Sequence, residues 1–223
     1  MSDYNSGENT EENTGESVKT EEATVDNEIK LYVGDTILDG INISIKNIGP
    51  ILVNSLLWVL TIWIPFINVG TTIGMFTGIV VKISRGETIS YTEIFNPIYR
   101  KFMGDYFLTV GLIFMGVLIG ILFLIVPGII LSIAWGFALL LVVDKEKNPM
   151  DAIKLSHDIT YGHKGRIFLI SLILSVIFSV IQTVLKYFDN DFASFLIIII
   201  AIFQMFVSLG IQASMYKQLA GKT

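Results

Sequence analysis

The chain contains no cysteine and only two histidines among its 223 residues. Disulfides and thiolate chemistry, whether nucleophilic or metal-binding, are therefore excluded. His157 and His163 alone fall short of the three or four ligands that a metal site normally needs. Only 16% of the residues are charged, against about 25% in a typical soluble domain, whereas 52% are hydrophobic. We expect no metal, no cofactor and no nucleic-acid partner, and we expect the main surroundings of the chain to be the lipid bilayer.

The few charges are concentrated at the start of the sequence. Of the 20 acidic and 15 basic side chains, residues 1–30 hold nine and two, which leaves 11 acidic and 13 basic side chains for residues 31–223. The first segment is also poor in large apolar groups, so it cannot bury enough surface to offset the entropy cost of ordering. The sequence predicts a disordered, acidic, cytoplasmic tail over 1–30, without the basic and apolar regions of a signal peptide. It predicts a transmembrane domain over 31–223.

Six apolar runs follow this tail, at 45–64, 66–83, 105–125, 128–143, 167–187 and 192–215. Each is close to the roughly 20 residues with which a helix crosses the hydrocarbon core. Buried strands are far shorter, at about 4–8 residues, and a lone strand would leave its backbone groups unpaired in lipid. The sequence therefore predicts an all-α, polytopic membrane protein with six transmembrane helices arranged as three hairpins.

Short turns and basic residues determine the predicted orientation. Pro127-Gly128 predicts a tight turn between the third and fourth helices, and the sequence FDND at 188–191 predicts a polar turn between the last two. Apart from Lys186, the basic residues of the transmembrane domain lie on the side opposite these turns. Because positive charge is retained in the cytoplasm, we expect a multi-pass protein of the cell membrane with cytoplasmic N- and C-termini.

Three short amphipathic segments separate the predicted hairpins or precede them, at 35–48, 90–103 and 148–161. The first repeats isoleucine at spacings of three and four. In the second, Ser90 and Glu93 form a capping-box pattern, and Pro97 is expected to kink or split the helix. In the third, Asn148 is the expected N-cap and Pro149 the first helical residue. We expect all three to lie along the cytoplasmic headgroups.

Small residues recur at every fourth position in three of the predicted helices. They are Gly70, Gly74 and Gly78, then Gly116 and Gly120, then Gly128, Ser132 and Gly136. In lipid, such stripes let helix backbones approach each other closely. We interpret them as helix-packing positions, with a flexible gate or substrate groove as the alternative. A shift of 58 residues superposes the first set on the third, which suggests repeated units.

No ionisable side chain lies well inside a predicted span, which argues against proton relays and ion-coupled transport. Arg85 and Asp144 end the second and fourth spans, and the repeat places them one residue apart. We expect them to be neighbours in an exposed ion pair that contributes at most about 1 kcal/mol. Ser171, Ser175 and Ser179 share one face of the fifth helix, where they either line a polar path or bond across helices.

Two stretches, 70–95 and 125–170, carry a wider set of motifs: a small-residue helix ending in Arg-Gly-Glu, a Pro-Gly-Ile sequence, and an Ala…Ser…Thr-x-Gly segment. The residues concerned are Arg85, Gly86, Glu87, Phe95, Pro127, Gly128, Ile129, Asp144, Ala152, Ser156, Thr160 and Gly162. With these motifs, 45–215 resembles a group of prokaryotic integral membrane proteins related to the membrane domain of glycerophosphodiester phosphodiesterases. The soluble phosphodiesterase domain has no counterpart here, so the resemblance implies a membrane fold and no hydrolase activity.

Most of these distinctive residues are expected in the cytoplasmic segments and not at mid-membrane. The leading hypothesis is therefore a non-enzymatic protein that organises lipid or binds a membrane-protein partner or a second copy of itself. The alternative is a transporter or permease of a neutral or lipidic solute. A third hypothesis, an enzyme acting on lipid, requires a cytoplasmic cleft lined by Asp144, His157 and Asp158.

Overall fold

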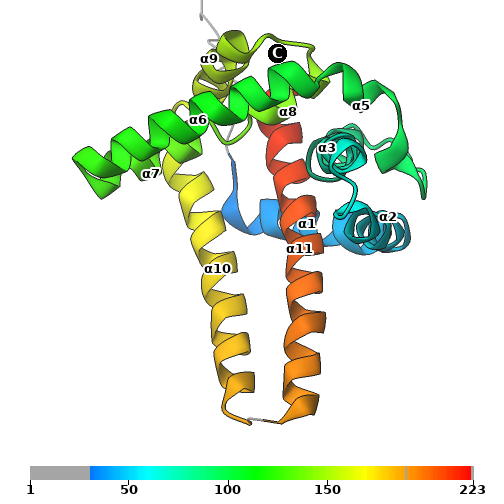
Figure 1. The fold of residues 1–223 in the computed structure, drawn as a ribbon. Helices are drawn as coiled ribbons and strands as arrows, with labels where there is room; N and C mark the ends of the chain where they lie inside the picture. The colour runs from blue at the N-terminus through cyan, green and yellow to red at the C-terminus, as the bar shows by residue number, and fades with distance from the viewer. Residues whose placement is uncertain (1–30, 189, 222–223) are drawn as a thin grey trace, which may run out of the picture.

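The computed structural model describes residues 31–188 and 190–221, and every regular element within these ranges is a helix (Figure 1). The predicted tail over 1–30 lies outside the described residues. The α-helices are α1 (Val33–Lys46), α2 (Ile48–Thr61), α3 (Pro65–Ile73), α4 (Ile79–Ser84), α5 (Ile98–Lys101), α6 (Met103–Phe123), α7 (Ile125–Ala134), α8 (Ala138–Asp144), α9 (Pro149–Thr160), α10 (Lys164–Lys186) and α11 (Asp191–Ala220). A π-helical turn, η1 (Gly74–Gly78), joins α3 to α4, and a 3-10 turn, η2 (Glu93–Phe95), precedes α5.

The apolar runs form helices that are suited to a membrane. Five continuous or nearly continuous helices are long and apolar enough to cross one, and α1 with α2 makes a sixth if this bent pair is a single span. The bend between α1 and α2 is 73°. It lies at Asn47, whose side-chain amide donates a hydrogen bond to the Ile43 carbonyl at 2.9 Å. The chain is therefore all-helical with five to six candidate spans, and the first predicted span is not straight.

The buried core lies at one end of the molecule. We call this part the hub; it consists of α1, α4, α8, α9 and residues 206–220 of α11. Ile79, Leu141 and Leu219 have exposed fractions of 0 to 1% there. By contrast, only 11% of the apolar window in α6 and 17% of that in α10 are buried within the protein. Outside the hub, the helices consequently offer apolar side chains to a surrounding that has to be apolar as well.

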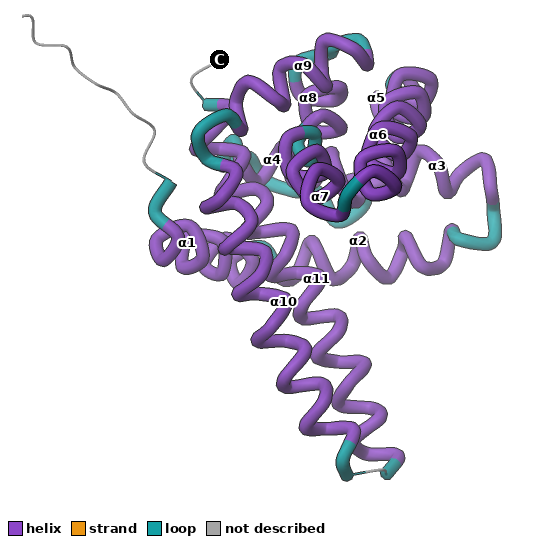
Figure 2. The backbone as a smooth tube through the Cα atoms, turned by 90° about the vertical axis from the view of Figure 1, so that its left-hand side faces the viewer, coloured by secondary structure: helices purple, strands orange, loops and turns teal. Residues whose placement is uncertain are grey.

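Three helix pairs extend from the hub in different directions. In Figure 1 the α10–α11 pair runs down the page, whereas α6 and α7 run across it. Figure 2 shows from the side that α2 also runs across the page, toward a tip that it shares with α3. Each pair joins consecutive helices through a short connection.

The turn between α6 and α7 lies at Leu124, so the prediction of a turn at Pro127-Gly128 is wrong. Leu124 has an extended backbone (φ −162°, ψ 141°), and α7 begins directly after it. Pro127 occupies the first turn of α7, where its missing N–H removes no helical hydrogen bond. Gly128 lets α6 and α7 approach each other closely, because a Cβ atom there would lie 2.9 Å from the backbone nitrogen of Ile121.

Helix α1 packs with a small, polar face and not with its isoleucine stripe. Thr36, Gly40 and Ser44 are buried against α11, whereas Ile45 is 56% exposed. The Ser44 hydroxyl donates to the Phe206 carbonyl at 2.9 Å. A small-residue face lets the two backbones approach closely, which outweighs the apolar stripe in lipid. The face of α1 that packs is therefore the small-residue face, where the helix crosses α11 (Figure 1), and its position relative to the headgroups stays a prediction.

The other two amphipathic segments form short helices at the hub. In the third segment, Asn148 is the N-cap of α9 as predicted, since its side-chain oxygen accepts the Asp151 N–H at 3.0 Å. The second segment is split as predicted: η2 ends at Phe95, Pro97 follows, and α5 begins at Ile98.

Candidate functional site

The Arg-Gly-Glu sequence ends α4 with a fixed loop. Gly86 has a φ of +74°, which residues with a Cβ rarely adopt. Its N–H donates to the Ile83 carbonyl at 2.9 Å, and the Glu87 N–H donates to the Lys82 carbonyl at 2.9 Å. These two bonds form a Schellman cap, which satisfies the last carbonyls of the helix. The cap holds Arg85 at the helix end, where its side chain can reach a neighbouring helix.

Arg85 and Asp144 are neighbours, as predicted from the repeat. The guanidinium bonds the Asp144 carboxylate and, at 3.1 Å, the Asp144 carbonyl. The Tyr216 hydroxyl of α11 donates to the other oxygen of the same carboxylate at 2.6 Å. The Asp144 side chain is only 4% exposed, so the predicted pair is not a fully exposed one. Together the three residues tie the ends of α4, α8 and α11.

A second buried carboxylate, that of Glu93, bonds another residue of α4. Lys82 donates to Glu93 at 2.9 Å and the Tyr99 hydroxyl donates at 2.8 Å, while the side chain of Glu93 is 3% exposed. Burial raises the pKa of Glu93, but the hydrogen bonds from Lys82, Tyr99 and Asn96 outweigh it and hold the pKa below its usual value of 4.5. Burial and the bond to Glu93 raise the pKa of Tyr99, which stays protonated. The predicted capping-box role of Glu93 is therefore wrong.

Gly70, Gly74 and Gly78 leave space for residues 94–100 to pack closely against their helix. The Tyr99 ring lies directly against Gly78, and a Cβ on Gly74 would be 2.9 Å from the Ile94 backbone. Gly70 faces the aliphatic part of Arg100 at an ordinary contact distance.

Asn54 of α2 binds the backbone of segment 90–103 through two hydrogen bonds. Its side-chain oxygen accepts the Ile94 N–H at 3.1 Å and its amide donates to the Ser90 carbonyl at 2.8 Å.

Ser156 and Thr160 of α9 support a break in the neighbouring helix. The chain leaves helical geometry between Ala134 and Phe137, which frees backbone groups at the junction of α7 and α8. The Ser156 hydroxyl donates to the Ala134 carbonyl at 2.8 Å and accepts the Phe137 N–H at 3.2 Å. Thr160 also reaches the Ala134 carbonyl, at 3.3 Å. Gly162, with a φ of +78°, then turns the chain from α9 toward α10.

The remaining small residues of the predicted stripes lie in the α6–α7 pair and in the break after it. The ring of Trp135 fills the space beside Gly116, and a Cβ on Gly120 would lie 3.0 Å from the Gly128 Cα. Gly136, in the break, lies near the carbonyls of Ser132 and Ile133 in α7. These contacts support helix packing and leave little room for a gate along the glycines.

Two residues of the predicted interfacial motif lie apart from the ion pairs. Pro127 is near the tip of the α6–α7 pair, and Phe95 is 39% exposed at the end of η2.

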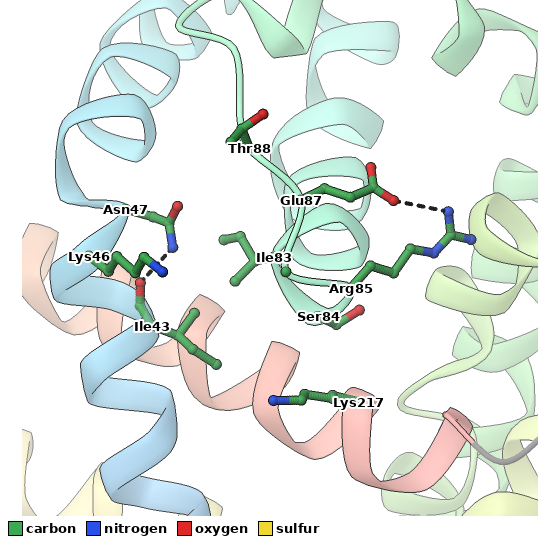
Figure 3. Close-up of a pocket in the computed structure, with 10 residues that line it drawn as sticks. Ile43, Lys46, Asn47, Ile83, Ser84, Arg85, Glu87, Thr88 and Lys217 are labelled. Carbon is green, nitrogen blue, oxygen red and sulfur yellow. Dashed lines mark hydrogen bonds and ion pairs between the residues drawn. The ribbon is translucent and has the colours of Figure 1, made fainter.

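A cleft of about 350 Å³ opens beside Arg85, between α1, the end of α4 and α11 (Figure 3). We call it the two-lysine cleft. Its lining comprises Ile43, Lys46, Asn47, Ile83, Ser84, Arg85, Gly86, Glu87, Thr88 and Lys217. Figure 3 shows Lys46 and Lys217 extending toward the same space from opposite sides, while Arg85 turns toward Glu87. Among residues 31–188 and 190–221, neither lysine has a carboxylate within ion-pair distance.

A second cavity of about 250 Å³ lies on the other side of Arg85. It is lined by Asp144, Lys82 and Tyr99 among others, but by neither His157 nor Asp158. Those two side chains are exposed on α9. The cleft required for an enzyme acting on lipid, with Asp144, His157 and Asp158 together, is therefore not formed by this cavity.

Sequence reasoning found Arg85 and Asp144 but missed several of their partners. Tyr216 lies 72 positions from Asp144, and no spacing pattern connects the two. Asn54 is a single polar residue within the apolar run 45–64, and this pattern does not indicate its bonds to Ser90 and Ile94. Lys46 and Lys217 were interpreted as topology signals alone, although they come from opposite ends of the chain and meet at one cleft.

Comparison with known proteins adds no relative. No family model matches the chain, and neither the curated proteins nor the solved structures contain a match. The resemblance to the membrane domain of glycerophosphodiester phosphodiesterases therefore stays a prediction that depends on the motifs quoted above.

Proposed function

We propose that this chain is a non-enzymatic, multi-pass protein of the cell membrane that organises anionic lipid at the cytoplasmic surface. Its helix pairs insert into the bilayer as three hairpins from the cytoplasmic side, and both termini stay there. The arrangement of basic residues supports this orientation, because α5, α9, the start of α10 and the end of α11 gather at one end (Figure 1). The positive-inside rule assigns that end to the cytoplasm.

The observation that carries the proposal is the pair of lysines across the two-lysine cleft. Lys46 and Lys217 present two ammonium groups without a carboxylate partner in the described part of the chain. Ile43 and Ile83 form an apolar wall beside them. A phosphate group accepts hydrogen bonds from ammonium groups, and an acyl chain packs against apolar side chains. Basic pockets of this kind at the cytoplasmic ends of helices suit anionic lipid heads.

The test measures lipid binding to the purified full chain in detergent by native mass spectrometry. We expect phosphatidylglycerol to bind more tightly than phosphatidylcholine. Each lysine near an anionic head contributes about 1 kcal/mol, so K46Q/K217Q should weaken phosphatidylglycerol binding about 30-fold. The matched control K147Q/K154Q removes the same charge outside the cleft and should have little effect.

Two outcomes would contradict the proposal. Equal losses in K46Q/K217Q and K147Q/K154Q would mean that diffuse charge attracts the lipid and that the cleft has no special role. If inorganic phosphate at the same concentration displaces phosphatidylglycerol completely, the cleft is a site for a soluble anion and not for a lipid.

A further inference from the structure

A groove with a polar lining lies between α10 and α11, where both helices leave the hub. It measures about 300 Å³ and is lined by Ile170, Ser171, Leu174, Ser175, Gln204, Ser208, Ile211, Gln212 and Met215. The hydroxyl and amide groups come from both helices, at successive intervals of four residues. Polar side chains from both helices therefore share a groove with apolar ones inside two candidate membrane spans, Lys164–Lys186 and Asp191–Ala220.

The groove continues toward α7. A neighbouring cavity of about 380 Å³ shares Ser171, Gln212 and Met215 with the first and adds Ser132 and Gly136 from the region of the α7 break. Because the two cavities share three lining residues, we treat them as one neutral groove. Their combined lining contains no ionisable side chain.

Several polar groups in the neutral groove have no hydrogen-bond partner among the residues that the structure describes. Gln204 accepts a hydrogen bond from Gln182 at 2.9 Å, and its own amide N–H groups find no acceptor in the described part of the chain. The side chains of Ser175, Ser208 and Gln212 make no hydrogen bond within residues 31–188 and 190–221. Unpaired polar groups are costly in a hydrocarbon surrounding, so an occupant that offers donors and acceptors is expected.

We propose that the neutral groove binds the uncharged, hydroxyl-bearing head of a neutral glycerolipid. A charged head would be placed at membrane depth without a counter-ion, which is expensive. A neutral head can instead exchange hydrogen bonds with the serines and glutamines. The exposed Phe168 and Leu172 on α10, at 41% and 43%, extend the apolar surface for the acyl chains. This site differs from the two-lysine cleft in position and in lipid class.

The test uses photo-crosslinking of the purified full chain in detergent with a photoactivatable diacylglycerol. We expect S208A/Q212L to lower the crosslinking yield at least fivefold, and the control S179A, on α10 outside the groove, to leave it unchanged. K46Q/K217Q should also leave the diacylglycerol yield unchanged, so this result is independent of the proposal for the two-lysine cleft. If S208A/Q212L lowers the thermal midpoint, S175A/S208A replaces it, because both serines are exposed and neither side chain bonds another of the described residues.

An unchanged yield in the groove variants would overturn the assignment. So would a photoactivatable phosphatidylglycerol that labels the groove as strongly as diacylglycerol. Light scattering measures the oligomeric state as a third test. If the protein is dimeric and the groove variants are monomeric, a second copy and not a lipid head occupies the groove, which also overturns the assignment.

Discussion

At the scale of single residues, Glu93 carries the buried charge that holds segment 90–103 against α4. It receives bonds from a lysine of α4 and from Tyr99, whose ring occupies the space beside Gly78. Removing one partner of a buried ion pair leaves an uncompensated charge, which costs more than an exposed pair contributes. Through Tyr99, the hydrogen bonds of Glu93 are thus connected to the packing of the π-helical turn η1.

The titration of Glu93 predicts a specific loss of stability in acid. Its pKa in the folded protein lies below the usual value of 4.5, so the unfolded chain takes up the proton first as the pH falls. The stabilisation is fully present above about pH 5 and is lost as the pH falls through the lowered pKa. Glu93→Gln should cost about 2 kcal/mol at neutral pH. It should also flatten the decline of the thermal midpoint, measured in detergent from pH 7 to pH 3.

The control for this prediction is Glu146→Gln. Glu146 pairs with Lys101 at 2.8 Å, but both side chains are more than half exposed, so the pair should be worth little. The same decline of the midpoint in Glu93→Gln as in the unsubstituted protein would assign the acid sensitivity to other carboxylates.

At the scale of elements, the second helix of two pairs is irregular at related positions. The π-helical turn Gly74–Gly78 interrupts the helix after α3, and the break after Ala134 interrupts the helix after α7. With the 58-residue shift, these irregularities fall within a few residues of each other. In each case the segment that follows the pair covers the irregularity, with Tyr99 in one and Ser156 in the other. Irregular backbone at membrane depth is tolerated only where protein covers it.

Substitution of Ser156 measures how much its hydrogen bonds stabilise the break between α7 and α8. In Ser156→Ala the buried Phe137 N–H loses its acceptor and the Ala134 carbonyl keeps only Thr160. An unsatisfied buried group costs about 1–3 kcal/mol, so we expect a loss of about 2 kcal/mol in the free energy of unfolding, measured by denaturant titration in detergent. Ser132→Ala is the matched control, because that hydroxyl bonds only within its own helix, to Ile129. A loss of the same size in both variants would remove the special role of Ser156.

Elements were predictable from the sequence where a local pattern decides the outcome. Helix lengths follow from apolar runs, and the start of α9 follows from Asn148. The face of α1 was not predicted, although Thr36, Gly40 and Ser44 repeat at intervals of four in the same way as the glycines. A stripe of isoleucines next to a stripe of small residues leaves open which face meets a neighbour, and only the position of α11 decides it. Contacts such as Asp144 with Tyr216 are likewise set by tertiary packing.

At the scale of the whole molecule, the three helix pairs differ at their tips. No charged residue occurs at 47–81 or at 106–143, and the tips of the first two pairs expose Trp63 by 88% and Phe123 by 81%. The tip of the α10–α11 pair instead carries Lys186 and Asp191. A charged tip is suited to water beyond the bilayer, whereas the apolar tip with Trp63 is suited to the interface.

The directions of the pairs lead to the last prediction. Pairs that point in different directions cannot all lie along the normal of one flat bilayer. If all three pairs cross the bilayer, they have to rotate where they join the hub. We expect Trp63→Cys and Asn190→Cys, spin-labelled in a chain without native cysteine, to lie closer together in lipid nanodiscs than in detergent. Pulsed electron paramagnetic resonance measures this distance. Ile177→Cys with Ile199→Cys, both within the α10–α11 pair, should give the same distance in both media, because that pair moves as one unit. An unchanged distance between positions 63 and 190 would mean that the pairs keep their divergent directions in the bilayer, and six complete crossings would then be ruled out.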